Sequence, residues 1–132
     1  MGDVHDGKPR LVLLESPYKG DVEVNVTYAR ACLRDSLRRG EAPIASHLLY
    51  TQPGVLDDDV PDERQLGIDA GLAWTAVADA SVVYIDHGIT GGMWRGIEAA
   101  IEAGLPVYLR RLGLTSEDLT LKNKFAKTEN NC

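Results

Sequence analysis

Residues 81–95 read Ser-Val-Val-Tyr-Ile-Asp-His-Gly-Ile-Thr-Gly-Gly-Met-Trp-Arg, an order that is typical of an open α/β sheet. An apolar, β-branched run ends at Asp86, a loop with three glycines follows, and a helix-compatible segment begins near Met93. At the start of such a helix, backbone N–H groups point at an anion or a sugar hydroxyl, and the macrodipole favours negative charge. Glycines in a tight βα turn can also serve only to provide positive φ. The stretch therefore predicts a strand, a turn and a helix, and leaves open whether the turn binds a ligand.

The rest of the chain alternates in the same way between short apolar runs and helical periodicity. The expected strands are 11–14, 42–45, 81–85 and 106–109, and the expected helices are 21–39, 62–78 and 93–103. Asp21 is expected to cap the first helix, while Gly40 and Gly104 end the first and the third. Residues 46–61 are expected to form a long loop, of the kind that is usually functional or a lid.

Two of the expected helices carry an apolar face that can be traced at steps of three and four residues. In the first helix this face comprises Val22, Val26, Ala29, Leu33 and Leu37. In the second it comprises Leu66, Ala70, Ala73, Trp74 and Val77.

The alternation predicts an α/β fold in which a parallel sheet has helices on both faces. We expect a flavodoxin-like three-layer sandwich with strand order 2-1-3-4, formed by one domain over residues 1–112, and a polar C-terminal tail over 113–132. In that order the winding reverses between the first and third strands, and ligands bind at the carboxyl ends of strands at such a point. The loops expected there are 15–21 and 86–92. Both are rich in residues that bind sugars and phosphates.

Composition excludes several classes of protein. The 132 residues carry a formal net charge of −6, which argues against a nucleic-acid backbone as partner and against an anionic membrane surface. No apolar run is long enough to span a bilayer, and residues 1–10 lack the apolar segment of a secretory signal. Cys32 and Cys132 are expected to be free thiols in a reducing compartment, so we expect a cytoplasmic protein.

Three motifs resemble those of a known superfamily. They are Ser16-Pro-Tyr-Lys-Gly-Asp21 followed by Asn25, Pro43-Ile-Ala-Ser-His-Leu-Leu-Tyr50, and Asp86-His-Gly-Ile-Thr-Gly-Gly-Met93. Together they resemble the nucleoside 2-deoxyribosyltransferase-like superfamily, most closely its small members from bacteriophages and actinobacteria, over roughly residues 11–110. The resemblance implies cleavage or transfer at the N-glycosidic bond of a nucleoside or nucleotide, without a cofactor. It also implies a homo-oligomer, with a neighbouring subunit completing the pocket.

The resemblance implies the following site residues. The catalytic candidates are Asp86, Glu98, Tyr18 and Asp69. The substrate-binding candidates are Ser16, Pro17, Gly20, Asn25, His47, Gly88, Thr90, Gly91, Gly92 and Met93. Breaking a C1′–N bond develops an oxocarbenium-like centre, which a neighbouring carboxylate can stabilise and trap. No metal is expected, because His5, His47 and His87 lack ligand spacing.

The sequence departs from the superfamily at its nucleophile. The glutamate that members place at the start of the third helix falls on Gly96 here. The nearest acid, Glu98, is two residues further along, which turns a side chain by about 200° on a helix. Either the helix is shifted or Glu98 faces solvent. Glu15, directly after the first strand, is either a relocated carboxylate or a solvated side chain. The alternative to an enzyme is a non-catalytic binder of a nucleotide-derived small molecule, in phage counter-defence or regulation.

Overall fold

The computed structural model describes residues 7–112, which fold into four strands and the helices between them. The elements are β1 Arg10–Glu15, α1 Val22–Arg38, β2 Glu41–Ile44, α2 Ser46–Leu49, α3 Pro61–Ala73, the 3₁₀ turn η1 Trp74–Ala76, β3 Ala80–Tyr84, α4 Gly91–Glu102 and β4 Val107–Arg110. The short helix α2 begins where a continuous loop was expected. The predicted tail over 113–132 and Cys132 lie outside the described residues.

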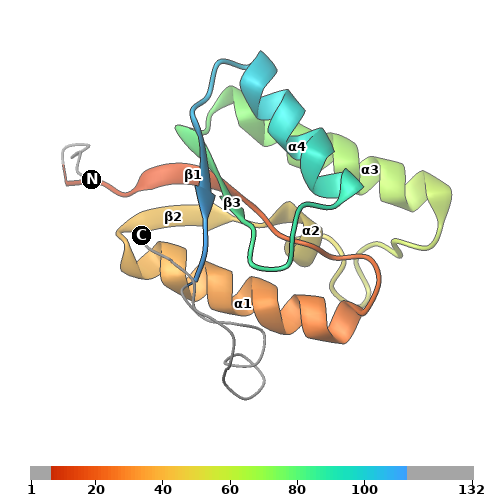
Figure 1. Cartoon of the computed structure of the whole chain (residues 1–132). Helices are drawn as coiled ribbons and strands as arrows, with labels where there is room; N and C mark the ends of the chain where they lie inside the picture. The colour runs from red at the N-terminus through yellow and green to blue at the C-terminus, as the bar shows by residue number, and fades with distance from the viewer. Residues whose placement is uncertain (1–6, 113–132) are drawn as a thin grey trace.

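The four strands form one parallel sheet in the order β2-β1-β3-β4, which confirms the predicted topology. Helix α1 covers one face of the sheet, while α3 and α4 lie on the other, as Figure 1 shows. The protein is therefore a flavodoxin-like three-layer α/β sandwich. Pro43 pairs with Val12 from β2, a strand at the edge of the sheet, where a residue without an N–H is tolerated.

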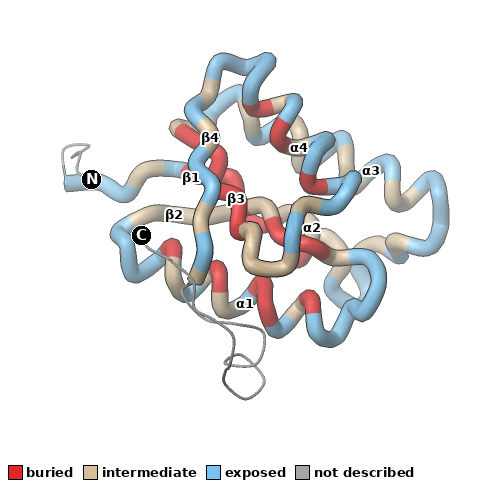
Figure 2. Tube along the Cα trace, viewed as in Figure 1, coloured by how far each residue is buried: buried red, intermediate tan, exposed pale blue. Residues whose placement is uncertain are grey.

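Successive side chains along each central strand face opposite layers, because the period of a strand is two residues. Val12 and Leu14 of β1 belong to the cluster under α1, together with Val82 and Tyr84 of β3. Val83 of β3 instead packs against α4 through Met93 and Ile97. Figure 2 shows the buried residues along the sheet and on the facing sides of α1 and α4. The parity of a residue along a strand therefore decides which layer it meets.

The buried face of α1 overlaps only in part with the apolar face that periodicity predicts, since Val26, Ala29 and Leu33 pack on the core but the two ends of that face do not. Its buried residues are Asn25, Tyr28, Ala29, Cys32 and Ser36, whereas Val22 and Leu37 are exposed. The helix is rotated because its polar side chains have partners on the inside: the Tyr28 hydroxyl donates to Asp86, and the Ser36 hydroxyl donates to Glu41. Cys32 is a buried free thiol, as expected.

No residue of α3 is fully buried, in contrast to α1 and α4 (Figure 2). Most of its predicted apolar face points outward, with exposed fractions of 61% for Leu66 and 56% for Val77, which follows η1, whereas Trp74 of that face lines a cavity. The opposite face of α3 lines a cavity instead of packing closely on the sheet.

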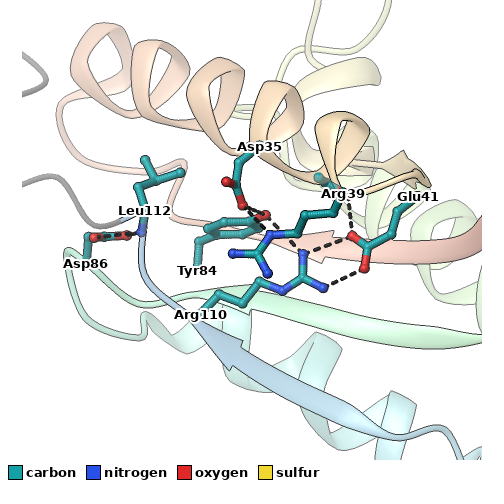
Figure 3. Close-up of polar contacts among 8 residues, drawn as sticks. Asp35, Arg39, Glu41, Tyr84, Asp86, Arg110 and Leu112 are labelled. Atoms are coloured by element: carbon teal, nitrogen blue, oxygen red, sulfur yellow. Dashed lines mark hydrogen bonds and ion pairs between the residues drawn. The ribbon is translucent and has the colours of Figure 1, made fainter. Parts of the chain in front are cut away.

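Polar side chains join α1 to the far strands of the sheet. Arg110 of β4 forms a two-pronged ion pair with Glu41 of β2, with nitrogen–oxygen distances of 2.9 and 2.5 Å (Figure 3). The Tyr84 hydroxyl donates to Asp35 of α1 at 2.6 Å and accepts from Arg110 at 3.1 Å. Burial raises the pKa of the Glu41 carboxyl, but its hydrogen bonds from Arg110 and Ser36 outweigh this and lower the pKa below its usual value.

The ends of the helices follow the predicted signals. The Asp21 carboxylate accepts from the Val24 amide at the start of α1. Gly40 and Gly104 have φ of +86° and +79°, a conformation that favours glycine and ends the helices before them. Within residues 7–112, no helix combines the length and the apolar character needed to cross a membrane.

Candidate functional site

A cavity of about 430 Å³ opens at the carboxyl ends of the central strands, between α3, α4 and the sheet. Its walls come from the end of β1 and the loop that follows it, from residues around α2, from the start of α4, and from the inner face of α3. The lining is largely apolar, with a few polar groups among the side chains. This size and composition are typical of pockets for small organic ligands.

Glu15, the last residue of β1, points into this cavity and against the first turns of α4. A Cβ atom added at Gly96 would lie 2.1 Å from the Glu15 Oε2 and 2.6 Å from its Cδ, which no real contact allows. A side chain at position 96 would therefore require the Glu15 carboxyl to move from this position. Within residues 7–112, no hydrogen bond or ion pair reaches the Glu15 side chain, and burial raises its pKa to about 8. At neutral pH the group is mainly the neutral acid.

Ser16 and His47 form a polar pair beside Glu15. The Ser16 Oγ and the His47 Nε2 are 2.8 Å apart, which brings the end of β1 together with α2. Burial lowers the pKa of His47 to about 4, so the imidazole is neutral at pH 7. Both residues line the cavity, where the sequence analysis places them as substrate-binding candidates.

The loop after β1 is held by the first turn of α1. The Asn25 side-chain amide donates to the backbone carbonyls of Tyr18 and Lys19, at 2.9 and 3.0 Å. Gly20 follows with a φ of +106°. Asn25 and Gly20 thus shape the loop, whereas Tyr18 and Lys19 line the cavity.

The start of α4 forms another wall of the cavity. The Thr90 hydroxyl accepts from the Met93 amide at 3.2 Å and caps the helix. Thr90, Gly91, Gly92 and Met93 all line the cavity, as the sequence analysis expects for binding residues, and Arg95 joins them.

The wall formed by α3 and the preceding loop carries groups that the sequence analysis did not assign to the site. The Trp74 indole donates to the Tyr50 hydroxyl at 2.9 Å, and Arg64 pairs with Asp58 at 2.8 Å. All four residues line the cavity. The wall thus combines an aromatic pair with an internal ion pair.

Asp86, the first catalytic candidate, lies outside the cavity lining. Its carboxylate accepts from the Tyr28 hydroxyl at 2.6 Å and from the Leu112 amide at 3.1 Å, the latter contact shown in Figure 3. Its own amide donates to the same Tyr28 oxygen at 2.9 Å, and the His87 ring stacks on the Tyr28 ring. The physical reason is parity: Asp86 continues the side-chain direction of Val82 and Tyr84, toward α1.

The remaining candidates also lie outside the cavity lining. Asp69 is exposed on α3, and its carboxylate accepts a hydrogen bond from Gln65. Glu98 is exposed on α4, so of the two alternatives for this residue the structure shows the one in which it faces solvent. Pro17 is buried beneath the loop, and Gly88 has a φ of +87° in the turn after β3. Of the catalytic candidates, the structure brings only Tyr18 to the cavity.

Two signals in the sequence point to Glu15 once they are combined. The first signal is strand parity: Glu15 points to the same face of the sheet as Leu13. The helices that cover that face can be derived from the strand order, because the crossovers between parallel strands are right-handed. Gly96 inside a helix is the second signal, because glycine there costs about 1 kcal/mol relative to alanine unless its small size is needed. No comparable signal marks Tyr50 and Trp74, which meet only in three dimensions.

Within the part of the chain that the structure describes, no group of three or more His, Cys, Asp or Glu side chains is placed to hold a metal ion. A family model described as "Domain of unknown function (DUF7768)" matches residues 10–110, which span all four strands. No curated protein matches the chain.

Proposed function

Because the chain belongs to the DUF7768 family, a domain family of unknown function, we propose its function from the geometry of its cavity: cleavage or transfer at the N-glycosidic bond of a nucleoside or nucleotide. The observation that carries the proposal is the meeting of three separate segments at one cavity. Residues of the cavity wall at 16–19, 46–50 and 90–93 come from the three motifs that resemble the nucleoside 2-deoxyribosyltransferase-like superfamily.

The chemistry of the walls supports this choice of ligand. A nucleobase is flat and apolar on its faces, and the aromatic pair Trp74–Tyr50 with Ile68 and Leu72 offers such a surface. A ribose needs hydrogen-bond partners, which Ser16, His47 and Tyr18 can supply. A carboxyl group at the reacting carbon completes the set, and Glu15 lines the same cavity.

The direct test is incubation of the purified protein with a panel of nucleosides and 5′-nucleotides, followed by chromatography for released base. A second base in the mixture reports transfer. The matched variants are Ile68→Trp, which fills the cavity from α3, and Ile101→Trp, on the exposed side of α4. We expect base release by the wild type and by Ile101→Trp, and its loss in Ile68→Trp. Equal activity in both variants would place the chemistry elsewhere.

A second function is favoured by one observation: Asp86, Asp69 and Glu98 all lie outside the cavity. A site without these acids fits a non-catalytic binder of a nucleotide-derived small molecule. Such a binder would be stabilised by its ligand by about 2.7 kcal/mol at a hundredfold excess over Kd. A thermal shift with a panel member that is never cleaved would support this second function over the first.

A further inference from the structure

We infer that Glu15 is the catalytic carboxyl group of this site, acting as general acid and then as general base, and that Gly96 is there to admit it. The inference rests on the proposed function and adds to it the residue that performs the proton transfers. It is drawn from the contacts of Glu15, because the acids that the sequence analysis favours lie elsewhere.

Three features of Glu15 set it apart from the other acids around the cavity. Its carboxyl has no hydrogen-bond or ion-pair partner among residues 7–112, whereas Asp58 is paired with Arg64 and Glu63 accepts from the Asp57 amide at 2.6 Å. It lies on the floor of the cavity, at the end of β1. It also occupies space that a side chain at position 96 would need. An unpartnered acid held by a close-fitting backbone is positioned to act on a ligand.

The surroundings of Glu15 keep it in the form that an acid catalyst requires. Burial raises its pKa to about 8, so at neutral pH it carries a proton to donate. The other charged or titratable groups that line the cavity are Tyr18, Lys19, His47, Tyr50, Asp58, Glu63, Arg64 and Arg95. His47 is neutral because of its lowered pKa. It can orient the ligand together with Ser16, but it is a weak proton donor near pH 7.

Glu15 donates its proton to the base while the electron pair of the C1′–N bond leaves with that base. The carboxylate then faces the oxocarbenium carbon and stabilises its charge. Water, or a second base in transfer, adds to C1′ and returns a proton to Glu15. The products are the free base and the sugar, or the exchanged nucleoside, and the acid is regenerated.

The test compares Glu15→Gln with Glu102→Gln, an exposed glutamate of α4, on the panel described above. We expect Glu15→Gln to lower kcat/KM at least a hundredfold while it still gives the ligand-induced thermal shift, and Glu102→Gln to match the wild type. A folded Glu15→Gln variant that keeps its activity within threefold overturns the inference and leaves the proposed function standing. A panel on which the wild type releases no base overturns both.

The pH profile of the wild type provides a test that needs no variant. Since the protonated acid is the active form, we expect kcat/KM to fall above about pH 8, tenfold for each further pH unit. A profile that stays flat to pH 9.5 overturns the inference even where base is released. The same measurement on Glu102→Gln should give the wild-type profile.

Discussion

Residues 15 and 96 share one volume, although they come from opposite ends of the domain. The glutamate carboxyl fills the position of the missing Cβ at Gly96, so the consequence of changing either residue depends on the other. Glycine in a helix is normally unfavourable, and here the cost is offset by room for a functional group. The energetic coupling of the two residues can be measured directly.

We expect Gly96→Ala to destabilise the wild type by about 1–3 kcal/mol, because the added Cβ forces the Glu15 side chain or α4 to move. In a Glu15→Ala background the same change should stabilise the protein by up to about 1 kcal/mol, through the higher helix propensity of alanine. Urea unfolding of the four proteins gives the coupling energy. Additive effects of the two substitutions would contradict the overlap.

The raised pKa of Glu15 predicts a pH dependence of stability with a definite sign. The unfolded carboxyl ionises near 4.5 while the folded one stays protonated to about 8, so its ionisation favours the unfolded chain across that window. We therefore expect Glu15→Gln to gain stability over the wild type as pH rises from 4.5 to 8, by on the order of a few kcal/mol. Urea unfolding at pH 5 and pH 8.5 measures this difference. A pH-independent difference would refute it, and Glu102→Gln is the control.

At the scale of elements, α3 is packed less closely on the sheet than α1 and α4. It has no fully buried residue, because its inner face borders the cavity and its outer face carries Leu66, Ala70 and Ala73 toward solvent. An apolar stripe of this kind is typical of a surface that meets another protein chain. The homo-oligomer expected from the sequence would cover it.

We expect Leu66→Lys to reduce the oligomer mass measured by light scattering, because a charge on the outer face of α3 opposes contact between two copies. Leu66 is 61% exposed, so the substitution should change the stability of the single chain by less than about 0.5 kcal/mol. Ile101→Lys, equally exposed on α4, is the matched control. A wild type that is monomeric at all concentrations, or a Leu66→Lys variant of unchanged mass, would refute this placement.

Across the whole molecule, the ion pair between Arg110 and Glu41 joins β4 to the start of β2, the strands at the two edges of the sheet. Both side chains are largely buried, with exposed fractions of 12% and 10%. Removing one partner leaves the other charge buried and uncompensated, a more costly change than removing both. The pair therefore secures the β4 edge of the sheet together with the Tyr84–Asp35 contact (Figure 3).

We expect Arg110→Met to cost about 3–5 kcal/mol in the free energy of unfolding, and Arg110→Met with Glu41→Met to recover much of that loss. The lowered pKa of Glu41 also predicts the direction of a pH dependence. The contribution of its carboxylate to the free energy of unfolding is present above pH 4.5 and is lost as pH falls through the pKa of the folded state. Urea unfolding at pH 7 and pH 3.5 measures both effects. A double variant that is less stable than Arg110→Met would contradict the expectation.

The topology could be predicted because it depends on the order of apolar runs, which the sequence displays directly. Strand order 2-1-3-4 and the helix ends at Gly40 and Gly104 are confirmed. Which face of a helix turns inward could be predicted only in part from periodicity: on α1, Val26, Ala29 and Leu33 pack on the core as predicted. The inward rotation that also buries Asn25, Tyr28 and Ser36 depends on their hydrogen-bond partners. The partners lie 5 to 58 residues away.

The convergence of the predicted loops at one cavity could be predicted from the sequence, whereas the acid proposed for it could not. Ser16, His47 and Thr90 line one cavity as the switch point implies, since the loops there converge whatever their side chains do. The proposed acid differs from the expected one because Glu15, at the end of β1, and Asp86, just beyond β3, stand at opposite parity and so enter opposite layers. That difference becomes visible only when strand parity and crossover handedness are considered together.

The shared volume of Glu15 and Gly96 also limits the order in which descendants of this chain can change. A lineage that acquired a carboxylate on the helix would have to give up the one on the strand first, and would pass through an intermediate with no acid at all. The reverse order would crowd two side chains into one space. Among relatives, we therefore expect the two positions to exchange residue types as a pair, with a large residue at one accompanied by a small residue at the other.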